Sequence, residues 1–227
     1  MQRCRELSRG TRPAPARIEA ILAATMLHLE TGDFCSPLPG SGVAAQLATD
    51  RLARLANNSG APQIPQPERQ RVAMIAGAAL SLKLSGQGIA LGFTHTGAAT
   101  AKSEQGWSEA LAYATRAALP LVLVCAAVQS QRGAQKALAI TWETMSRLAK
   151  SSKLPVLTVD GTDAVAIYRV MQEATHRARQ GDGAAVIWCA LPAMSDRTAA
   201  NDPIRTLQRY LKVRGLLPAA PAKKRMR

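Results

Sequence analysis

The residues best suited to chemistry lie at positions 94–103, in the segment Thr-His-Thr-Gly-Ala-Ala-Thr-Ala-Lys-Ser. Hydroxyls, free backbone amides and one cation ahead of a helix start are typical of an anion-binding site. The candidate anion-binding residues are Thr96, Gly97, Thr100 and Lys102. The spacing of Gly, Lys and Ser is not that of a Walker-type phosphate loop. A solvated loop whose Thr and Ser side chains cap the next helix explains the same residues, so both interpretations stay open.

The histidines offer one candidate for proton transfer, His95, which falls in the same predicted loop. No Asp, Glu, Ser or Cys lies close enough in sequence to complete a relay with it. His28 and His176 fall in predicted helices beside polar or charged residues, and we interpret both as surface residues. The sequence therefore predicts no catalytic residue.

Two glycine motifs match nucleotide-binding sequences in their residues but not in their predicted structural context. The segment Gly40-Ser-Gly-Val-Ala-Ala45 follows Ser36-Pro-Leu-Pro39 rather than a strand, so its amides would not point at a pyrophosphate. The segment Gly181-Asp-Gly183 joins a predicted helix to a predicted strand, where a tight turn favours Gly and Asp. We interpret both as structural.

The loop at 94–103 is positioned by a predicted βαβ unit. An apolar strand at 88–93 precedes the loop, a helix at 104–118 follows it, and a second apolar strand covers 119–128. Such crossovers are right-handed and join parallel strands. Ligands of these folds bind over the carboxyl ends of the strands, where this loop lies.

The rest of the chain continues the alternation of strands and helices. Further helices are predicted at 16–30, 43–56, 68–84, 131–150, 162–180 and from Asp202 onwards, further strands at 154–159 and 184–191, and a loop at 34–42. Four strands alternating with helices predict an α/β fold, with a doubly wound parallel sheet and helices on both faces. We predict one domain over 15–217, a disordered basic N-terminus at 1–14 and a basic tail at 218–227.

Composition limits the partners. The formal charge of +14 suggests nucleic acid, but Lys and Arg are clustered only at the two ends, and 4% aromatic residues leave little for base stacking. No apolar run approaches the ~20 residues of a membrane span, and no signal-peptide pattern is present, so we expect a cytoplasmic protein without membrane contact. The four cysteines lack metal-ligand spacing and are interpreted as reduced structural thiols.

A family resemblance rests on several segments. In order, these are Ala76-Gly-Ala-Ala-Leu-Ser-Leu-Lys83, Ile89-Ala-Leu-Gly-Phe93, Glu104-Gln-Gly-Trp-Ser-Glu-Ala-Leu111, Leu119-Pro-Leu-Val-Leu-Val-Cys125, Val159-Asp-Gly-Thr-Asp163, and the stretch from Asp202-Pro-Ile to Arg214-Gly-Leu-Leu217. Together they resemble the alpha subunit of the thiamine-diphosphate-dependent 2-oxo-acid dehydrogenases, of the pyruvate and branched-chain type. The resemblance covers roughly the last two thirds of the chain and implies a thiamine-diphosphate-binding fold.

The resemblance also implies a metal site whose residues are missing here. In the family, Gly-Asp-Gly follows the first strand and an Asn pair ends the second, and Asp and Asn hold a magnesium ion that bridges to the diphosphate. The Gly-Asp-Gly positions fall on residues 98–100, or on 94–97 if counted from the strand, and neither range contains Asp. The Asn pair falls on Ala126 and Ala127, which offer no oxygen to a hard cation. The family's Tyr-Arg-x-His-Gly segment and His-Ser loop also have no counterpart.

The resulting hypothesis is a shortened, degenerate alpha-subunit homologue that keeps the fold. It would be a non-catalytic subunit or small-anion binder, without a metal or cofactor, and its enzyme activity stays an open question. One alternative is an active 2-oxo-acid oxidoreductase subunit that binds thiamine diphosphate and magnesium through the candidate loop. Another is a basic nucleic-acid-associated protein. The resemblance implies a homodimer or a beta-type subunit as partner.

Overall fold

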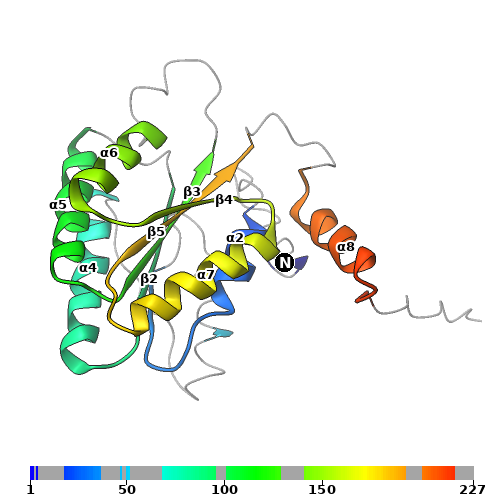
Figure 1. Ribbon diagram of the computed structural model, residues 1–227, viewed down its shortest axis with the longest axis horizontal. Coiled ribbons are helices and arrows are strands. Elements are labelled where there is room, and N and C mark those ends of the chain that lie inside the picture. Colours follow the sequence, from blue (N-terminus) through cyan, green and yellow to red (C-terminus); the bar gives the residue numbers. More distant parts are fainter. Residues whose placement is uncertain are drawn as a thin grey trace, which may run out of the picture.

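The protein is built around a parallel sheet of five strands (Figure 1). The computed structural model describes residues 1, 2, 4, 18–36, 47, 50–51, 68–95, 101–128, 141–192 and 201–217. The strands are β1 (Phe34–Ser36), β2 (Ala90–His95), β3 (Leu121–Val128), β4 (Val156–Asp160) and β5 (Ala185–Leu191). Their spatial order is β1-β2-β3-β5-β4, and every neighbouring pair is parallel. The predicted α/β class and parallel sheet are confirmed.

The central strands are apolar along almost their whole length. Strand β3 reads Leu-Val-Leu-Val-Cys-Ala-Ala-Val, and all but its last residue are buried. Strand β5, its neighbour, is buried in the same way. A parallel sheet covered by helices on both faces needs such continuous apolar strands, because each face contacts a helical layer.

The described helices follow the predicted alternation. They are α2 (Glu19–Met26), α4 (Glu68–Ser85), α5 (Ala101–Arg116), α6 (Trp142–Ser152), α7 (Ala164–Arg179) and α8 (Pro203–Val213). Three of them begin at a residue whose side chain accepts hydrogen bonds from first-turn amides: Thr141 for α6, Asp163 for α7 and Asp202 for α8. The caps fix where these helices start, since the first amides of a helix have no partner within it.

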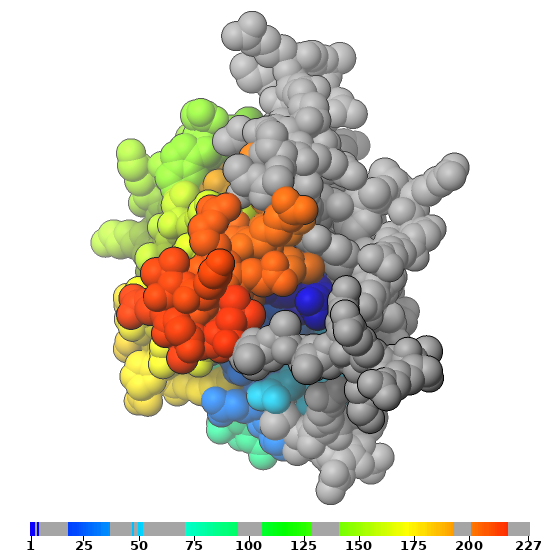
Figure 2. All heavy atoms as spheres, turned by 90° about the vertical axis from the view of Figure 1, so that its right-hand side faces the viewer, coloured from blue at the N-terminus to red at the C-terminus, as the bar shows by residue number. Residues whose placement is uncertain are grey.

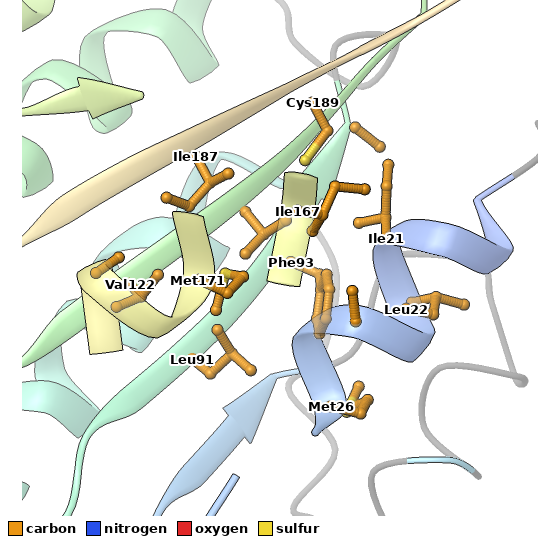
Figure 3. Close-up of a cluster of buried hydrophobic side chains, with 14 of the residues drawn as sticks. Ile21, Leu22, Met26, Leu91, Phe93, Val122, Ile167, Met171, Ile187 and Cys189 are labelled. Carbon is orange, nitrogen blue, oxygen red and sulfur yellow. The ribbon is translucent and has the colours of Figure 1, made fainter. Parts of the chain in front are cut away.

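The helices form two layers. Helices α4, α5 and α6 cover one face of the sheet, and α2 and α7 cover the other (Figure 1). Side chains alternate between the layers: Leu91 and Phe93 pack with α2 and α7, whereas Ala90 packs with α4 and α5. Figure 3 shows the first of these clusters, with Ile21 and Met26 of α2 and Met171 of α7 gathered against the strands. The predicted helices on both faces are confirmed.

Helix α8 lies outside the two layers, on the surface of the molecule (Figure 2, orange to red). It contacts α2 and α7. Pro203 is its only buried residue, and Val213 at its end is 81% exposed. The helix is therefore an addition to the domain rather than part of its core.

Several predicted boundaries were wrong. The segment 34–42 was predicted as a loop, but its first three residues form strand β1, which is too short for an apolar pattern to reveal. Strand β2 continues to His95, and α5 already begins at Ala101. The described part of the helix predicted at 131–150 begins at Trp142.

Parts of the other predictions fall outside the described residues. Of the helix predicted at 43–56, three residues are described, and Leu47, Asp50 and Arg51 are all helical. Of the N-terminal segment 1–14, Cys4 is described as helical and buried in the core. The tail at 218–227 lies outside the described residues, and the domain limits stay a prediction. No described helix is both long and apolar enough to cross a bilayer.

The amino edge of the sheet is closed by a buried ion pair. Asp33, whose side chain is fully buried, binds both terminal nitrogens of Arg179 at the end of α7, at 3.1 and 2.8 Å. The same carboxylate accepts hydrogen bonds from the backbone amides of Glu30 and Ile89, both at 2.8 Å. Arg179 also donates to the His28 carbonyl at 3.0 Å. This network joins the starts of β1 and β2 to α7.

Candidate functional site

The carboxyl edge of the sheet brings the ends of the strands into one row. His95 at the end of β2 stands opposite Ala126 of β3. Ala127, the next residue of β3, stands opposite Ala190 of β5, which in turn stands opposite Asp160 of β4. In open parallel sheets the ligand site lies outside this edge. The candidate site is therefore sought among these residues and the helix starts beside them.

The predicted anion loop is described only in part. Thr96, Gly97 and Thr100 lie outside the described residues, so their role stays a prediction. Lys102 lies in the first turn of α5 rather than in the loop, because α5 starts three residues earlier than predicted. A backbone position in a first helical turn is compatible with an anion site.

Two residues predicted in the loop belong to strand β2. Thr94 is fully buried, opposite Cys125 of β3, and His95 ends the strand. The prediction missed them because Thr-His-Thr lacks the apolar character of the preceding run, whereas pairing with β3 extends the strand. Placing His95 in a loop was therefore wrong.

Ala126 and Ala127 precede Val128, the last residue of β3, and lie at the positions where the resemblance places the Asn pair. They are 3% and 6% exposed, and their methyl groups pack on opposite faces of the sheet. An alanine side chain offers no electron pair to a metal, and magnesium requires oxygen ligands. Among the described residues, no group of three or more His, Cys, Asp and Glu side chains is arranged to hold a metal ion.

Asp160 and Asp163, at this edge, both make hydrogen bonds that stabilise the local backbone. Asp160 accepts hydrogen bonds from the amide and the hydroxyl of Thr162, both at 2.8 Å. Asp163 accepts from the amides of Val165 and Ala166 at 2.9 and 3.0 Å, which caps α7. Both carboxylates shape the turn after β4 and have a structural role.

Buried polar groups at the β1–β2 end of this edge were not foreseen from the sequence. Arg71 of α4 is 2% exposed, and its Nε donates to the Phe93 carbonyl at 3.2 Å. Ser36, the last residue of β1, is fully buried, and its hydroxyl has no hydrogen-bond partner. One sequence signal could have indicated that Arg71 is buried. Arg71 lies four residues before Ile75, so the two side chains share the apolar face of α4.

The cysteines form no disulfides, in agreement with their interpretation as reduced structural thiols. All four are free and buried. Burial raises the pKa of Cys35 and of Cys189 to about 12. Their thiols therefore stay protonated at neutral pH, and neither is activated as a nucleophile.

His28 differs from the predicted surface residue. Its ring is half-buried and lies 4.5 Å from the ring of Tyr168, measured between centroids. Burial lowers the pKa of His28, because a charged imidazolium is poorly solvated there. His176 is exposed, as predicted. Neither histidine is at the carboxyl edge.

Comparison with solved structures agrees with the fold. An enzyme structure from Mycobacterium smegmatis, assigned as thiamin diphosphate-dependent, superposes with a TM-score of 0.51 and 15% identity, over 76% of this chain and 31% of that chain. Benzoylformate decarboxylase from Polynucleobacter necessarius superposes with a TM-score of 0.52 and 13% identity, over 83% and 34%. The fold is the α/β fold of thiamine-diphosphate-dependent enzymes.

Sequence comparison identifies the family. The model of the family described as "Dehydrogenase E1 component" matches residues 52–191, more than half of the chain. The chain is 34% identical over 136 residues to the pyruvate dehydrogenase E1 component subunit alpha of Staphylococcus epidermidis, which covers 57% of this chain and 35% of that protein. The corresponding protein of Acholeplasma laidlawii is 30% identical over 128 residues, covering 56% and 36%.

A shorter match, to the 3-methyl-2-oxobutanoate dehydrogenase subunit alpha of Mycobacterium tuberculosis, is 44% identical over 52 residues, covering 23% of this chain and 14% of that protein. The chain therefore belongs to the dehydrogenase E1 component family, as the resemblance implied. It spans well under half the length of each of these relatives.

Proposed function

We propose that the chain is a degenerate homologue of the dehydrogenase alpha subunit, which keeps the fold without the magnesium and diphosphate motif. The observation that carries the proposal is the end of β3, where Ala126 and Ala127 fill the row opposite His95 and Ala190. Their methyl groups are buried, and by the family resemblance they lie where the magnesium site would need oxygen donors. We therefore propose no 2-oxo-acid oxidation by this chain.

The chain would then serve as a non-catalytic subunit or a small-anion binder. The predicted loop residues Thr96, Gly97 and Thr100, with Lys102 in the first turn of α5, supply hydroxyls, amides and one cation. Such groups bind an anion without a divalent ion. As partner we propose a second copy of the chain or a beta-type subunit, because the relatives are named as alpha subunits.

The second candidate function is an active oxidoreductase subunit that binds thiamine diphosphate in an unusual way. The match to the E1 family model over residues 52–191 favours it. In that case the candidate loop would hold the diphosphate together with magnesium.

A calorimetric titration of the purified chain with thiamine diphosphate separates these two functions. The titration is run with magnesium and again with EDTA. We expect no magnesium-dependent heat of binding, because Ala126 and Ala127 offer only methyl groups near the end of β3. Micromolar, magnesium-dependent binding would overturn the degenerate assignment and establish the active alternative.

The charge of +14 supports a third function, a basic protein associated with nucleic acid. It predicts retention on a DNA column that falls steeply with salt. Removal of residues 1–14 and 218–227 should then weaken the retention. Absence of retention at low salt would remove this function.

A further inference from the structure

We propose that helix α8 and the residues just after it, as far as Leu217, dock the protein on an anionic phospholipid surface. This inference goes beyond the proposed function and holds whether or not the chain binds thiamine diphosphate. It revises the expectation of a protein without membrane contact, which rested on the lack of an apolar run long enough to span a bilayer. A helix that lies on a lipid surface needs no such run, because only one of its sides meets the membrane.

Helix α8 is attached to the domain by one side. Its apolar residues Ile204, Leu207 and Leu211 recur at intervals of three and four positions and are partly buried. Because α8 contacts α2 and α7, this is the side that packs on the domain. The other side is exposed, and the helix lies on the surface of the molecule (Figure 2). A whole side of α8 is therefore accessible to a partner.

The exposed side of α8 carries positive charge. Arg205, Arg209 and Lys212 are all exposed, and their spacing of four and three residues places them in one stripe along the helix. None of the three forms an ion pair with another residue that the structure describes. The sequence has no Asp or Glu after Asp202, although eight Lys and Arg follow it. The stripe is therefore not neutralised by its neighbours in sequence, and it attracts an anionic surface.

Exposed apolar side chains lie at the carboxyl end of the same helix. Val213 is 81% exposed, Leu216 64% and Leu217 41%. Gly215, with φ of 66°, ends the helix. The Leu216 amide donates to the Leu211 carbonyl at 2.9 Å, which holds Leu216 at the helix end. Removal of these apolar side chains from water is favourable, so this end of α8 favours contact with apolar material.

The combination of cations and exposed apolar residues distinguishes lipid from other anionic partners. An anionic bilayer offers charged head groups to the stripe and hydrocarbon directly below them to the apolar side chains. A nucleic acid duplex offers phosphates along its backbone, but no apolar layer beneath them. A second copy of the chain is disfavoured as well, because it would bring a charge of +14 against an equal charge.

Cosedimentation of the full chain with phospholipid vesicles tests the proposal. The vesicles contain either phosphatidylcholine alone or equal parts of phosphatidylcholine and phosphatidylserine. We expect the chain to sediment with the anionic vesicles and to stay in solution with the neutral ones. Molar sodium chloride should release it, because salt screens the attraction.

Two variants separate the contribution of charge from that of apolar contact. Combining Arg205→Gln, Arg209→Gln and Lys212→Gln should weaken vesicle binding by about 100-fold, since each cation near an anionic bilayer contributes roughly fivefold. Combining Leu216→Ser with Leu217→Ser should weaken vesicle binding and leave retention on double-stranded DNA unchanged. All five side chains are exposed, so both variants should fold like the wild type, which circular dichroism checks.

The matched control removes three charges from the layer on the opposite face of the sheet. Arg116→Gln, Lys150→Gln and Lys153→Gln change exposed residues of α5 and α6 or next to them, and they give the same net charge as the α8 charge variant. This control should bind the vesicles like the wild type.

Three outcomes would overturn the proposal. The first is a wild type that ignores anionic vesicles, and the second is binding that falls equally in the α8 charge variant and in the control. The third is vesicle binding that the two leucine substitutions leave unchanged. If the α8 charge variant loses binding only to polyglutamate or to DNA, the partner of the stripe is an acidic protein or a nucleic acid instead of lipid.

Discussion

The two edges of the sheet use polar residues in opposite ways. At the amino edge, the buried carboxylate of Asp33 accepts hydrogen bonds from Arg179 and from two backbone amides. At the carboxyl edge, alanines of β3 and β5 face one another just before the strands end, and the Ser36 hydroxyl is buried without a hydrogen bond. The comparison teaches that a buried charge is kept where it holds strands to helices, whereas the described residues of the carboxyl edge include no group of side chains arranged to hold a metal ion.

The largest expected effect comes from breaking the ion pair of the amino edge. Asp33→Ala should lower the free energy of unfolding by about 3 kcal/mol, because it removes the buried partner of Arg179 and leaves two backbone amides without their acceptor. Urea denaturation measures the loss. The control is Asp182→Ala, whose pair with Arg177 is 3.6 Å long and about half exposed, and which should cost about 0.5 kcal/mol or less. Equal losses would show that the buried ion pair stabilises the fold no more than the exposed one.

Next in size is the close approach of α4 to β2. Gly92→Ala should destabilise the protein by about 2 kcal/mol, because the new methyl group meets Ile75 and Leu123 in a packed layer. Combining it with Ile75→Val should recover part of the loss. The measurement is again urea denaturation, and a neutral Gly92→Ala would show that the Ile75 side chain can move aside without cost.

A smaller effect is expected on the stability of the fold at acidic pH. The pKa of His28 is lower in the folded chain than its ordinary value of about 6.5. The unfolded chain therefore binds more protons as pH falls below 6.5, and stability should decrease in that range. His28→Phe should keep the packing on Tyr168 and remove this part of the pH dependence. Parallel stability curves from pH 7.5 to 5.5 for the two proteins would contradict it.

The smallest expected effect is slow chemical modification of the cysteine thiols. Folded protein at neutral pH should leave its four thiols unmodified by an aromatic disulfide reagent over minutes, because they are buried and those of Cys35 and Cys189 have a pKa of about 12. In guanidinium chloride all four should react. Fast modification of the folded chain would indicate that one face of the sheet opens readily.

Sequence patterns predicted the central strands and the helix starts better than the edge strand β1. Strands β3 and β5 are continuous apolar runs, and Asp163 and Asp202 are strong capping residues, so these elements could be located from residue types alone. Strand β1 could not, because three residues carry no period and their pairing with β2 is a contact over more than fifty residues. Family resemblance indicated Ala126 and Ala127, and the register now places them at the carboxyl edge.

The buried polar residues were beyond such patterns. Arg71 and Asp33 are charged residues, and composition rules place such residues in solvent. Their burial depends on partners distant in the chain: Phe93 for Arg71, and Arg179 for Asp33. A sequence shows the residue types, but which charges meet inside the molecule is decided by the fold.

The bond between Asp33 and Arg179 spans 146 positions of the chain, which has a consequence for synthesis. A nascent polypeptide emerges from the ribosome with Asp33 long before its arginine is made. The first strand therefore cannot be locked in place until α7 has left the exit tunnel. A chain that stops before α7 would carry a carboxylate with no cation to receive it, and we expect it to be a substrate for proteolysis rather than a stable fragment.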